Sequence, residues 1–362
     1  MSQKSCYLYG VAPADGPRSF GPVGLGGADT YTVCDGAIAI VASKMNRVEF
    51  AAQAPEKTLA SLAQHQRVLE QVMVHLPVIP LKFGTYADDD RQIVEIIHRG
   101  RKEFAGALEE YAGKVEVDIA AFWTDMNCVL ADVAQDKSVT AMKSRITEGS
   151  ASIEQRVAMG KLVKKLLDER REQVAAHIAA ELRTQWPGIV VNPAKDDSMV
   201  FNAAVLTGSK EQGRFEGFIN RLDRLFDDRL RFRCVGPLPP YSFATAEVRT
   251  VEAARIDAAR RALALGERAS LAEIKAAHRR ALQQTHPDMN LRASSAGEFK
   301  DVSEAYNLLE EYAMNVQHSF GADQSPMVLV KVRSLNDLRG PGKHAGVRTR
   351  AASRDAVEIG AA

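Results

Sequence analysis

The chain has 362 residues, of which 46% are hydrophobic, enough apolar surface for two or three ordinary domain cores. Its 47 basic and 46 acidic side chains are interspersed and leave a formal net charge of +1, so no global basic field points to nucleic acid or to an anionic membrane. Aromatic residues make up only 6% of the chain, which disfavours the stacking surfaces that bind single strands.

The cysteines and the N-terminus both indicate a reducing compartment. Cys6, Cys34, Cys128 and Cys234 are scattered, without a Cys-x-x-Cys pair, so we expect reduced thiols and neither a redox motif nor a metal motif. The first residues lack the charged and then apolar pattern of a secretion signal, and no apolar run is long enough to cross a bilayer. We therefore expect a soluble, cytoplasmic protein without a membrane span.

Residues 1–112 predict an N-terminal α+β domain, because short alternating segments there are interspersed with segments of helical spacing. The expected elements, in chain order, are a strand at 7–11, a loop at 16–28, one or two strands within 31–43, a helix from residue 55, a proline-interrupted edge strand at 77–86, and one helix that Asp88, Asp89 and Asp90 cap and that runs to residue 108.

Residues 113–248 predict a second α+β domain. A strand at 114–124 precedes helical segments that include a long helix over about 153–185, and short strands follow at 188–192 and 198–206. A helix at 211–226 and a strand at 230–235 complete the order strand, helix, strand, strand, helix, strand. This order is typical of a ferredoxin-like fold.

The end of that second domain is unusual. The strand at 230–235 runs into Gly236-Pro237 and Pro239-Pro240, and proline can neither donate a ladder hydrogen bond nor leave the preceding residue free to turn. We expect the strand to stop there and a rigid arm to carry Tyr241 and Phe243, exposed, at its far end. A simple stiff exit from the domain is the alternative.

Residues 251–316 predict an all-α module of three helices, followed by a flexible tail over 317–362 in which a short strand at 327–332 is the one periodic segment. The second helix begins with a capping box of Ser270 and Glu273 and ends before His286-Pro287-Asp288. Proline makes this tripeptide a fixed corner, and Lys275, Arg279 and Arg280 form a basic helix face that could orient an acidic partner.

No catalytic, cofactor or metal site is expected. The glycines at 21–27 lack the Lys-Ser/Thr of a phosphate-binding loop, and Asp196-Asp197 is typical of a turn. His65, His75 and His98 lie on separate predicted elements with no zinc spacing, and no nucleophile with its base can be assembled.

Four segments in chain order resemble the gas vesicle protein F/L family. They are Cys6-Tyr-Leu-Tyr-Gly-Val11, Leu76-Pro-Val-Ile-Pro-Leu-Lys-Phe-Gly-Thr85, Met199-Val-Phe-Asn-Ala-Ala-Val-Leu206 and Gly236-Pro-Leu-Pro-Pro-Tyr-Ser-Phe243. In the last, Leu238 stands where the family usually has Trp. The family's Tyr near the start of its long central helix is also absent, since Met159-Gly-Lys-Leu-Val163 stands there.

The three-helix module resembles a J domain, both around His286-Pro287-Asp288 and in its third helix, residues 298–309. His278, Ala281 and Met289 depart from the usual Tyr, Leu and Lys, and the first helix lacks the usual Tyr-Tyr pair. The resemblance implies that His286, Pro287 and Asp288 stimulate ATP hydrolysis by a chaperone of the DnaK type. A plain helix stop within a packing module is the alternative.

Together the resemblances imply a non-enzymatic accessory protein of gas vesicle assembly that is associated with gas vesicles, binds the hydrophobic shell protein and other accessory proteins, and recruits a DnaK-type chaperone. Tyr241, Phe243 and Leu238, with a sheet edge at 77–86, are the candidate shell contacts. The alternatives are a general J-domain co-chaperone with broad clients and a minor structural component of the vesicle shell.

Overall fold

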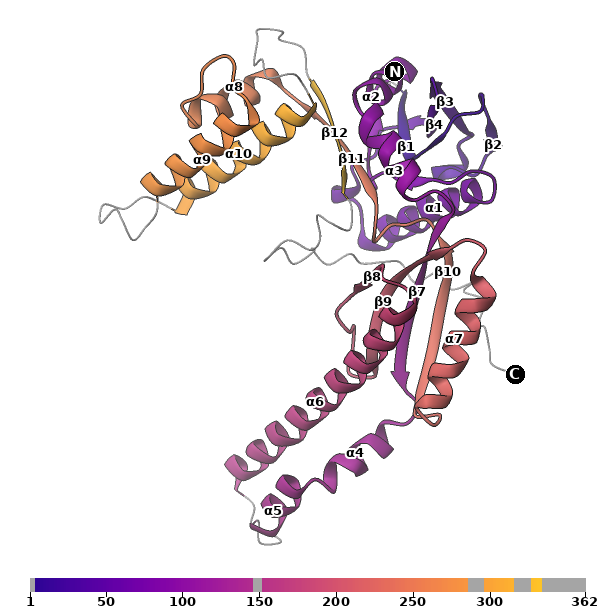
Figure 1. Ribbon diagram of the computed structural model, residues 1–362, viewed down its shortest axis with the longest axis vertical. Helices are drawn as coiled ribbons and strands as arrows, with labels where there is room; N and C mark the ends of the chain where they lie inside the picture. Colours follow the sequence, from indigo (N-terminus) through magenta and orange to yellow (C-terminus); the bar gives the residue numbers. More distant parts are fainter. Residues whose placement is uncertain (1–3, 146–151, 286–295, 316–326, 334–362) are drawn as a thin grey trace. The chain divides into compact units, whose positions relative to one another are not determined.

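The computed structural model describes residues 4–145, 152–285, 296–315 and 327–333, which form two compact units. Unit 1 holds the described residues up to Glu110 and those from Ala244 onward, and unit 2 is Tyr111–Phe243 (Figure 1). The chain therefore leaves unit 1 and returns to it. The mixed fold predicted from the sequence, with a second α+β domain and a helical C-terminal module, is confirmed.

Unit 1 is built on an antiparallel sheet with the order β2-β3-β4-β1-β5, in which β6 also pairs with β1. The strands are β1 (Lys4–Pro13), β2 (Ser19–Gly21), β3 (Thr30–Asp35), β4 (Ile38–Asn46), β5 (Ile79–Pro80) and β6 (Tyr86–Ala87). The predicted segment at 31–43 is thus two strands, joined at Gly36, whose φ is +63°. The predicted strand at 77–86 is wrong as one element, because its prolines leave only two short pairings with β1.

Helix α1 (Pro55–Met73) begins where Pro55 predicts it, and its N-cap, Ala54, makes no side-chain hydrogen bond. It buries Val68, Leu69 and Val72, together with His65, which its apolar pattern did not include. His65 Nδ1 lies 2.9 Å from the hydroxyl of Tyr7 on β1, so this pair joins the helix to the middle of the sheet.

The predicted helix after Asp88 is two helices, α2 (Asp90–Arg99) and α3 (Arg101–Glu110), which meet at Gly100. A Cβ at Gly100 would lie 2.7 Å from the Phe104 ring and 2.7 Å from the Val330 side chain, so only glycine allows this approach. Asp89 caps α2 as expected, accepting a hydrogen bond from the backbone N–H of Gln92 at 2.9 Å.

Unit 2 has the predicted ferredoxin-like topology. Its strands are β7 (Lys114–Trp123), β8 (Ile189–Val191), β9 (Met199–Gly208) and β10 (Leu230–Leu238), in the antiparallel sheet order β10-β7-β9-β8. Helix α6 (Ile153–Gln185) and helix α7 (Gln212–Leu225) supply its two crossovers, while α4 (Met126–Ala134) and α5 (Lys137–Arg145) precede α6. Trp186 lies in the core between the helices and the sheet, with its ring centroid 5.1 Å from those of Phe215 and Phe218.

The remainder of unit 1 is a β-hairpin whose two strands are separated in the sequence by helices. β11 (Thr245–Val251) pairs antiparallel with β12 (Met327–Arg333) over seven residue pairs, and α8 (Ala253–Ala262), α9 (Leu271–Thr285) and α10 (Ala296–Asn315) lie between them in sequence. The predicted helix at 251–265 is shorter, because Val251 closes β11 and the chain turns at Ala264, whose φ is +51°, before Gly266. β12 is the short strand expected within the tail.

The hairpin is anchored to the N-terminal sheet. Leu81, just after β5, bridges Ala246 of β11, and the N–H of Lys82 donates to the Ala246 carbonyl at 2.9 Å. β12 contacts α2 and α3, and Val328, Leu329 and Val330 are buried. The helices between β11 and β12 are therefore inserted into an element of unit 1.

Candidate interaction surfaces

The last strand of unit 2 does not stop at Gly236. β10 pairs with β7 up to Val235, passes an irregularity at Gly236-Pro237, and pairs again where Leu238 faces Glu116. A Cβ at Gly236 would lie 3.0 Å from the Val117 side chain, which explains the glycine at this close approach. The expectation of a strand that ends before the prolines is therefore wrong, since one irregularity accommodates them at the sheet edge.

Glu116, fully buried on β7, holds the end of this segment. Its carboxylate accepts hydrogen bonds from the backbone N–H of Ser242 at 2.6 Å and from the Ser242 hydroxyl at 2.9 Å. Charge-assisted hydrogen bonds of this kind are the stronger ones in proteins. The alternating pattern of β7 predicted its apolar face but gave no sign that this glutamate has a partner 126 residues away.

The expected exposure of the aromatic residues is wrong for Phe243, which is 1% exposed, and the Tyr111 hydroxyl donates to its carbonyl at 3.1 Å. Leu238 is 4% exposed, and Tyr241 is half-buried. A shell contact through Tyr241, Phe243 and Leu238 stays a prediction, and their burial makes a structural role for the segment the simpler interpretation.

The sheet edge at 77–86 is also covered. Leu81 is 1% exposed and bridges Ala246, so β11 occupies the edge that sequence left open. At the opposite end of the sheet, β2 pairs only with β3 among the described residues. β2 lies within the segment predicted as a loop. The sequence did not predict this strand, because three residues are too few to show an alternating pattern.

A hollow of about 590 Å³ lies beside β2. Its lining includes Arg18, Phe20 and Val23 around β2, and Val74 and His75 after the end of α1. Val74 is 79% exposed, the most exposed large apolar side chain of unit 1 among the described residues. A free strand edge next to a partly apolar hollow is suited to an extended segment of another chain that carries apolar side chains. The prolines and glycines around β2 predicted a loop, so the sequence pattern did not indicate this surface.

The helices α8, α9 and α10 pack around one core that includes Ile256, Ile274, Leu309 and Leu329 of β12. The predicted capping box is present, because Ser270 N–H donates to Glu273 at 2.7 Å and Glu273 N–H donates to Ser270 Oγ at 3.3 Å. We call residues 253–315 the helical module.

Lys275, Arg279 and Arg280 are exposed on α9, as the predicted basic face requires. The Lys275 ammonium lies 3.5 Å from a carboxylate oxygen of Glu310 on α10, and Arg279 Nε donates to the Lys275 carbonyl at 3.4 Å. His286, Pro287 and Asp288 lie outside the described residues, so their role stays a prediction.

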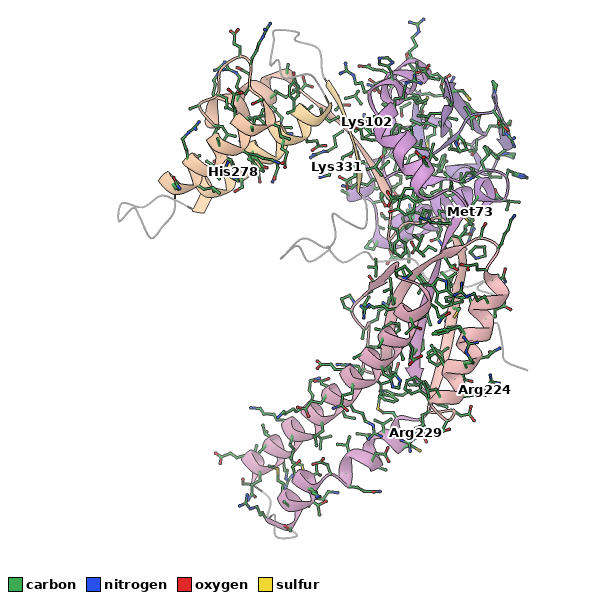
Figure 2. All side chains as sticks on the ribbon, in the orientation of Figure 1. Met73, Lys102, Arg224, Arg229, His278 and Lys331 are labelled. Carbon is green, nitrogen blue, oxygen red and sulfur yellow. The ribbon has the colours of Figure 1, made fainter. Side chains whose placement is uncertain are left out.

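His278, labelled in Figure 2, stacks on Tyr306 of α10 with ring centroids 4.0 Å apart and an angle of 10° between the planes. The Tyr306 hydroxyl donates to Glu310 at 2.6 Å. Burial lowers the pKa of His278, although Glu310 opposes that effect, so the ring is neutral near pH 7. His278 thus fills its position as a flat, neutral ring packed between α9 and α10.

The other singled-out groups have local structural contacts. Asp90 on α2 accepts from Tyr31 at 2.7 Å and from Lys44 at 2.8 Å, and Asp196 accepts from the hydroxyl of Ser198 at 2.6 Å. Within the described ranges, no group of three or more His, Cys, Asp or Glu side chains is placed to hold a metal ion. No helix in the part of the chain that the structure describes could cross a membrane.

Comparison with known proteins gives two separate matches. A family model described as "Gas vesicle synthesis protein GvpL/GvpF" matches residues 5–245, and one described as "DnaJ domain" matches residues 261–314. The first match ends at the start of β11, and the second lies wholly between β11 and β12.

Individual relatives follow the same division. "Gas vesicle protein F" of Dolichospermum flosaquae is 27% identical over 245 residues, which cover 66% of this chain and 96% of that protein. "Chaperone protein DnaJ" of Brevibacillus choshinensis is 39% identical over 64 residues, which cover 18% of this chain and 17% of that protein. The crystal structure of GvpF from an Anabaena species has a TM-score of 0.56 at 24% identity, covering 66% of this chain and 97% of that one, and shows the shared fold.

Proposed function

Because the chain belongs to the GvpL/GvpF family of gas vesicle synthesis proteins, and because a DnaJ domain is joined to it, we propose that it is a non-enzymatic assembly factor of gas vesicles. In this proposal it binds the hydrophobic shell protein in the cytoplasm and brings a DnaK-type chaperone to it. The observation that supports this most directly is the presence of both families in one chain, with the second inserted into a hairpin of the first unit.

The shell-binding half rests on the free edge of β2 and the hollow beside it. A very hydrophobic subunit aggregates through unpaired strand edges and apolar faces, and a partner that covers them delays this. Phe20, Val23 and Val74 supply apolar contacts, while the β2 edge supplies backbone hydrogen-bonding groups. We place the shell contact there in preference to the buried Phe243 and Leu238.

Co-purification tests this contact. We expect Val74→Asp to lower the amount of co-expressed shell protein recovered with the chain at least several-fold, since a carboxylate in the hollow must lose water to be covered. Leu59→Asp is the matched control, because Leu59 is also on the α1 segment and is 46% exposed but does not line the hollow. Equal recovery with both variants would count against the β2 surface, and no recovery with the unaltered chain would refute shell binding.

The chaperone half rests on the DnaJ match and on the exposed cations Lys275, Arg279 and Arg280. We expect the purified chain to raise the ATPase rate of a DnaK-type chaperone, and Asp288→Asn to abolish the increase while leaving the fold of the module intact. Steady-state ATPase measurements at saturating chain decide this. The same rate with and without the chain, or with both forms of it, would leave the module only a packing role.

A general co-chaperone is the second candidate, and the DnaJ match favours it. The two differ in clients, because an assembly factor protects the shell protein and not unrelated model proteins. Light scattering of heated or diluted clients separates them. Protection of several unrelated clients as good as that of the shell protein would favour the general co-chaperone.

A further inference from the structure

Positive charge is concentrated in one segment of the chain, although the formal net charge of the whole chain is close to zero. Residues 137–165 contain seven lysines and arginines and two glutamates, whereas the whole chain has a formal charge of +1. In the structure this segment is α5 and the first turns of α6, and we call its described residues, 137–145 and 152–165, the basic tip. All seven basic side chains of the tip are exposed.

The tip is held on a fixed base. Asp132 on α4 accepts a hydrogen bond from Arg170 of α6 at 2.6 Å and another from Arg229, just before β10, at 2.9 Å. α4 and α5 both contact α6 (Figure 1), and Val129, Val133 and Val139 are buried. The tip is therefore the end of a packed helical hairpin, whose base is joined to the sheet of unit 2.

One face of α6 in the tip is apolar and basic at once. Ile153 is 80% exposed and Val157 is 51% exposed, and Gly160, Lys161 and Lys164 continue the same stripe at helical spacing. The other large apolar residues of this stretch, from Met159 to Leu167, are half-buried. Two exposed aliphatic side chains therefore lie next to cations on a face that no described element covers.

The cations of this face are available for a partner. Lys164 lies 3.4 Å from Asp168 and Lys165 lies 3.6 Å from Glu169, both exposed pairs one helical turn apart that stabilise little. Among the described residues, Lys143, Arg145, Arg156 and Lys161 have no carboxylate within ion-pair distance. Lys137 is partly compensated by its neighbour Asp136. Most of the positive charge of the tip is therefore uncompensated.

We propose that the basic tip is a docking surface for an acidic, amphipathic helix of another protein. Apolar side chains of that helix would cover Ile153 and Val157, and its carboxylates would face Arg156, Lys161 and Lys164. A second copy of the tip is disfavoured, since like charges would meet. The segment from Met126 to Leu167 has no aromatic residue, so it lacks the rings that stack on nucleic-acid bases or anchor helices at a membrane interface.

The test uses the full chain and a synthetic helical peptide, labelled for fluorescence anisotropy, that carries a stripe of leucines flanked by glutamates on the same side of the helix. We expect Lys161→Glu with Lys164→Glu to weaken peptide binding about tenfold or more, because two attractive contacts become repulsive. Ile153→Ser with Val157→Ser should weaken it as well. Lys57→Glu with Lys210→Glu is the control of equal charge change, since both lysines are exposed and lie far along the chain from the tip.

Each outcome decides the proposal. Binding that needs both the leucines of the peptide and the lysines of the tip supports it. Equal weakening by the control pair would show that only net charge matters and would overturn it. So would tighter binding to phosphatidylglycerol vesicles or to an oligothymidine strand than to the peptide. If charge reversal alters the helix content, Lys161→Gln with Lys164→Gln must weaken binding in the same direction. The proposal does not depend on shell-protein binding.

Discussion

At the scale of single residues, two buried polar side chains decide how distant parts of each unit meet. Glu116 fixes Ser242 in unit 2, and His65 meets Tyr7 in unit 1. Both lie among apolar neighbours, where an unmade hydrogen bond is costly. Replacing either side chain should therefore change the stability of its unit, which the loss of a contact with the shell protein would not do.

Replacing Glu116 tests the structural role of the segment at 236–243. We expect Glu116→Ala to lower the free energy of unfolding of unit 2 by about 2–4 kcal/mol, because the N–H and the hydroxyl of Ser242 both lose the carboxylate that accepts from them. Ser242→Ala loses only the hydroxyl bond and should cost about 1 kcal/mol. Urea unfolding followed by tryptophan fluorescence measures both, since Trp123 and Trp186 lie in unit 2. Equal and negligible losses would mean that the segment is held by other contacts.

His65 makes unit 1 sensitive to acid. Burial, opposed by the Leu81 carbonyl, lowers the pKa of His65 to about 3 from its ordinary 6.5. The unfolded chain therefore binds a proton at this residue below about pH 6.5 while the folded one does not, so its contribution to stability is present above that pH and is lost as the pH falls toward 3.

The expected slope from this residue is about 1.4 kcal/mol per pH unit. Amide hydrogen exchange of β1 at pH 7 and pH 5, corrected for the intrinsic rate, should show a smaller pH effect in His65→Phe than in the unaltered chain. His177→Gln serves as the control, since His177 is half exposed on α6. An identical pH effect in the unaltered chain and in His65→Phe would contradict the buried, neutral assignment.

At the scale of elements, the break between α2 and α3 exists because another strand passes close to it. We expect Gly100→Ala to destabilise unit 1 by about 1–3 kcal/mol, since its Cβ would overlap Phe104 and Val330. Gly106→Ala, in α3 with open space around it, should instead stabilise by about 0.5–1 kcal/mol. Chemical unfolding of the two variants, monitored by circular dichroism, should give opposite signs.

Val330, which lies against Gly100, is part of β12. We call β12 a clasp, because its pairing with β11 and its contacts with α2 and α3 hold the C-terminal end of the helical module in place. A chain ending at residue 326 loses the pairing with β11 and the burial of Val328, Leu329 and Val330, each worth about 1.5–3 kcal/mol. We expect faster amide exchange in β11, α2 and α10. A chain ending at residue 333 keeps the strand and is the matched control, and its exchange should equal that of the full chain. Similar exchange in both truncations would exclude the clasp.

At the scale of the whole molecule, the helical module is an insertion and should be removable. Val251 and Met327 are paired at the end of the hairpin, so an Asn-Gly turn can replace residues 252–326 and join β11 to β12 directly. We expect the shortened chain to fold, to keep binding the shell protein and to lose chaperone stimulation. Co-purification and ATPase assays measure the two halves separately. Loss of both would show that the module does more than recruit a chaperone.

The sequence by itself determined the features that depend on neighbours along the chain. The order of elements in unit 2, the start of α1 at Pro55, the caps at Asp89 and Ser270, and the three-helix module follow from local spacing and capping chemistry. The segments that resemble the two families are likewise readable as short, contiguous motifs.

Only the tertiary structure decided which surfaces are free. The bond between Ser242 and Glu116 joins residues 126 positions apart, and β11 reaches β12 across the whole module. No local pattern encodes such pairings, because the sequence around each partner is that of an ordinary polar or strand residue. The pairing forms only when the chain folds. For that reason the buried Phe243, the covered edge at Leu81 and the open edge at β2 are visible only in the folded chain.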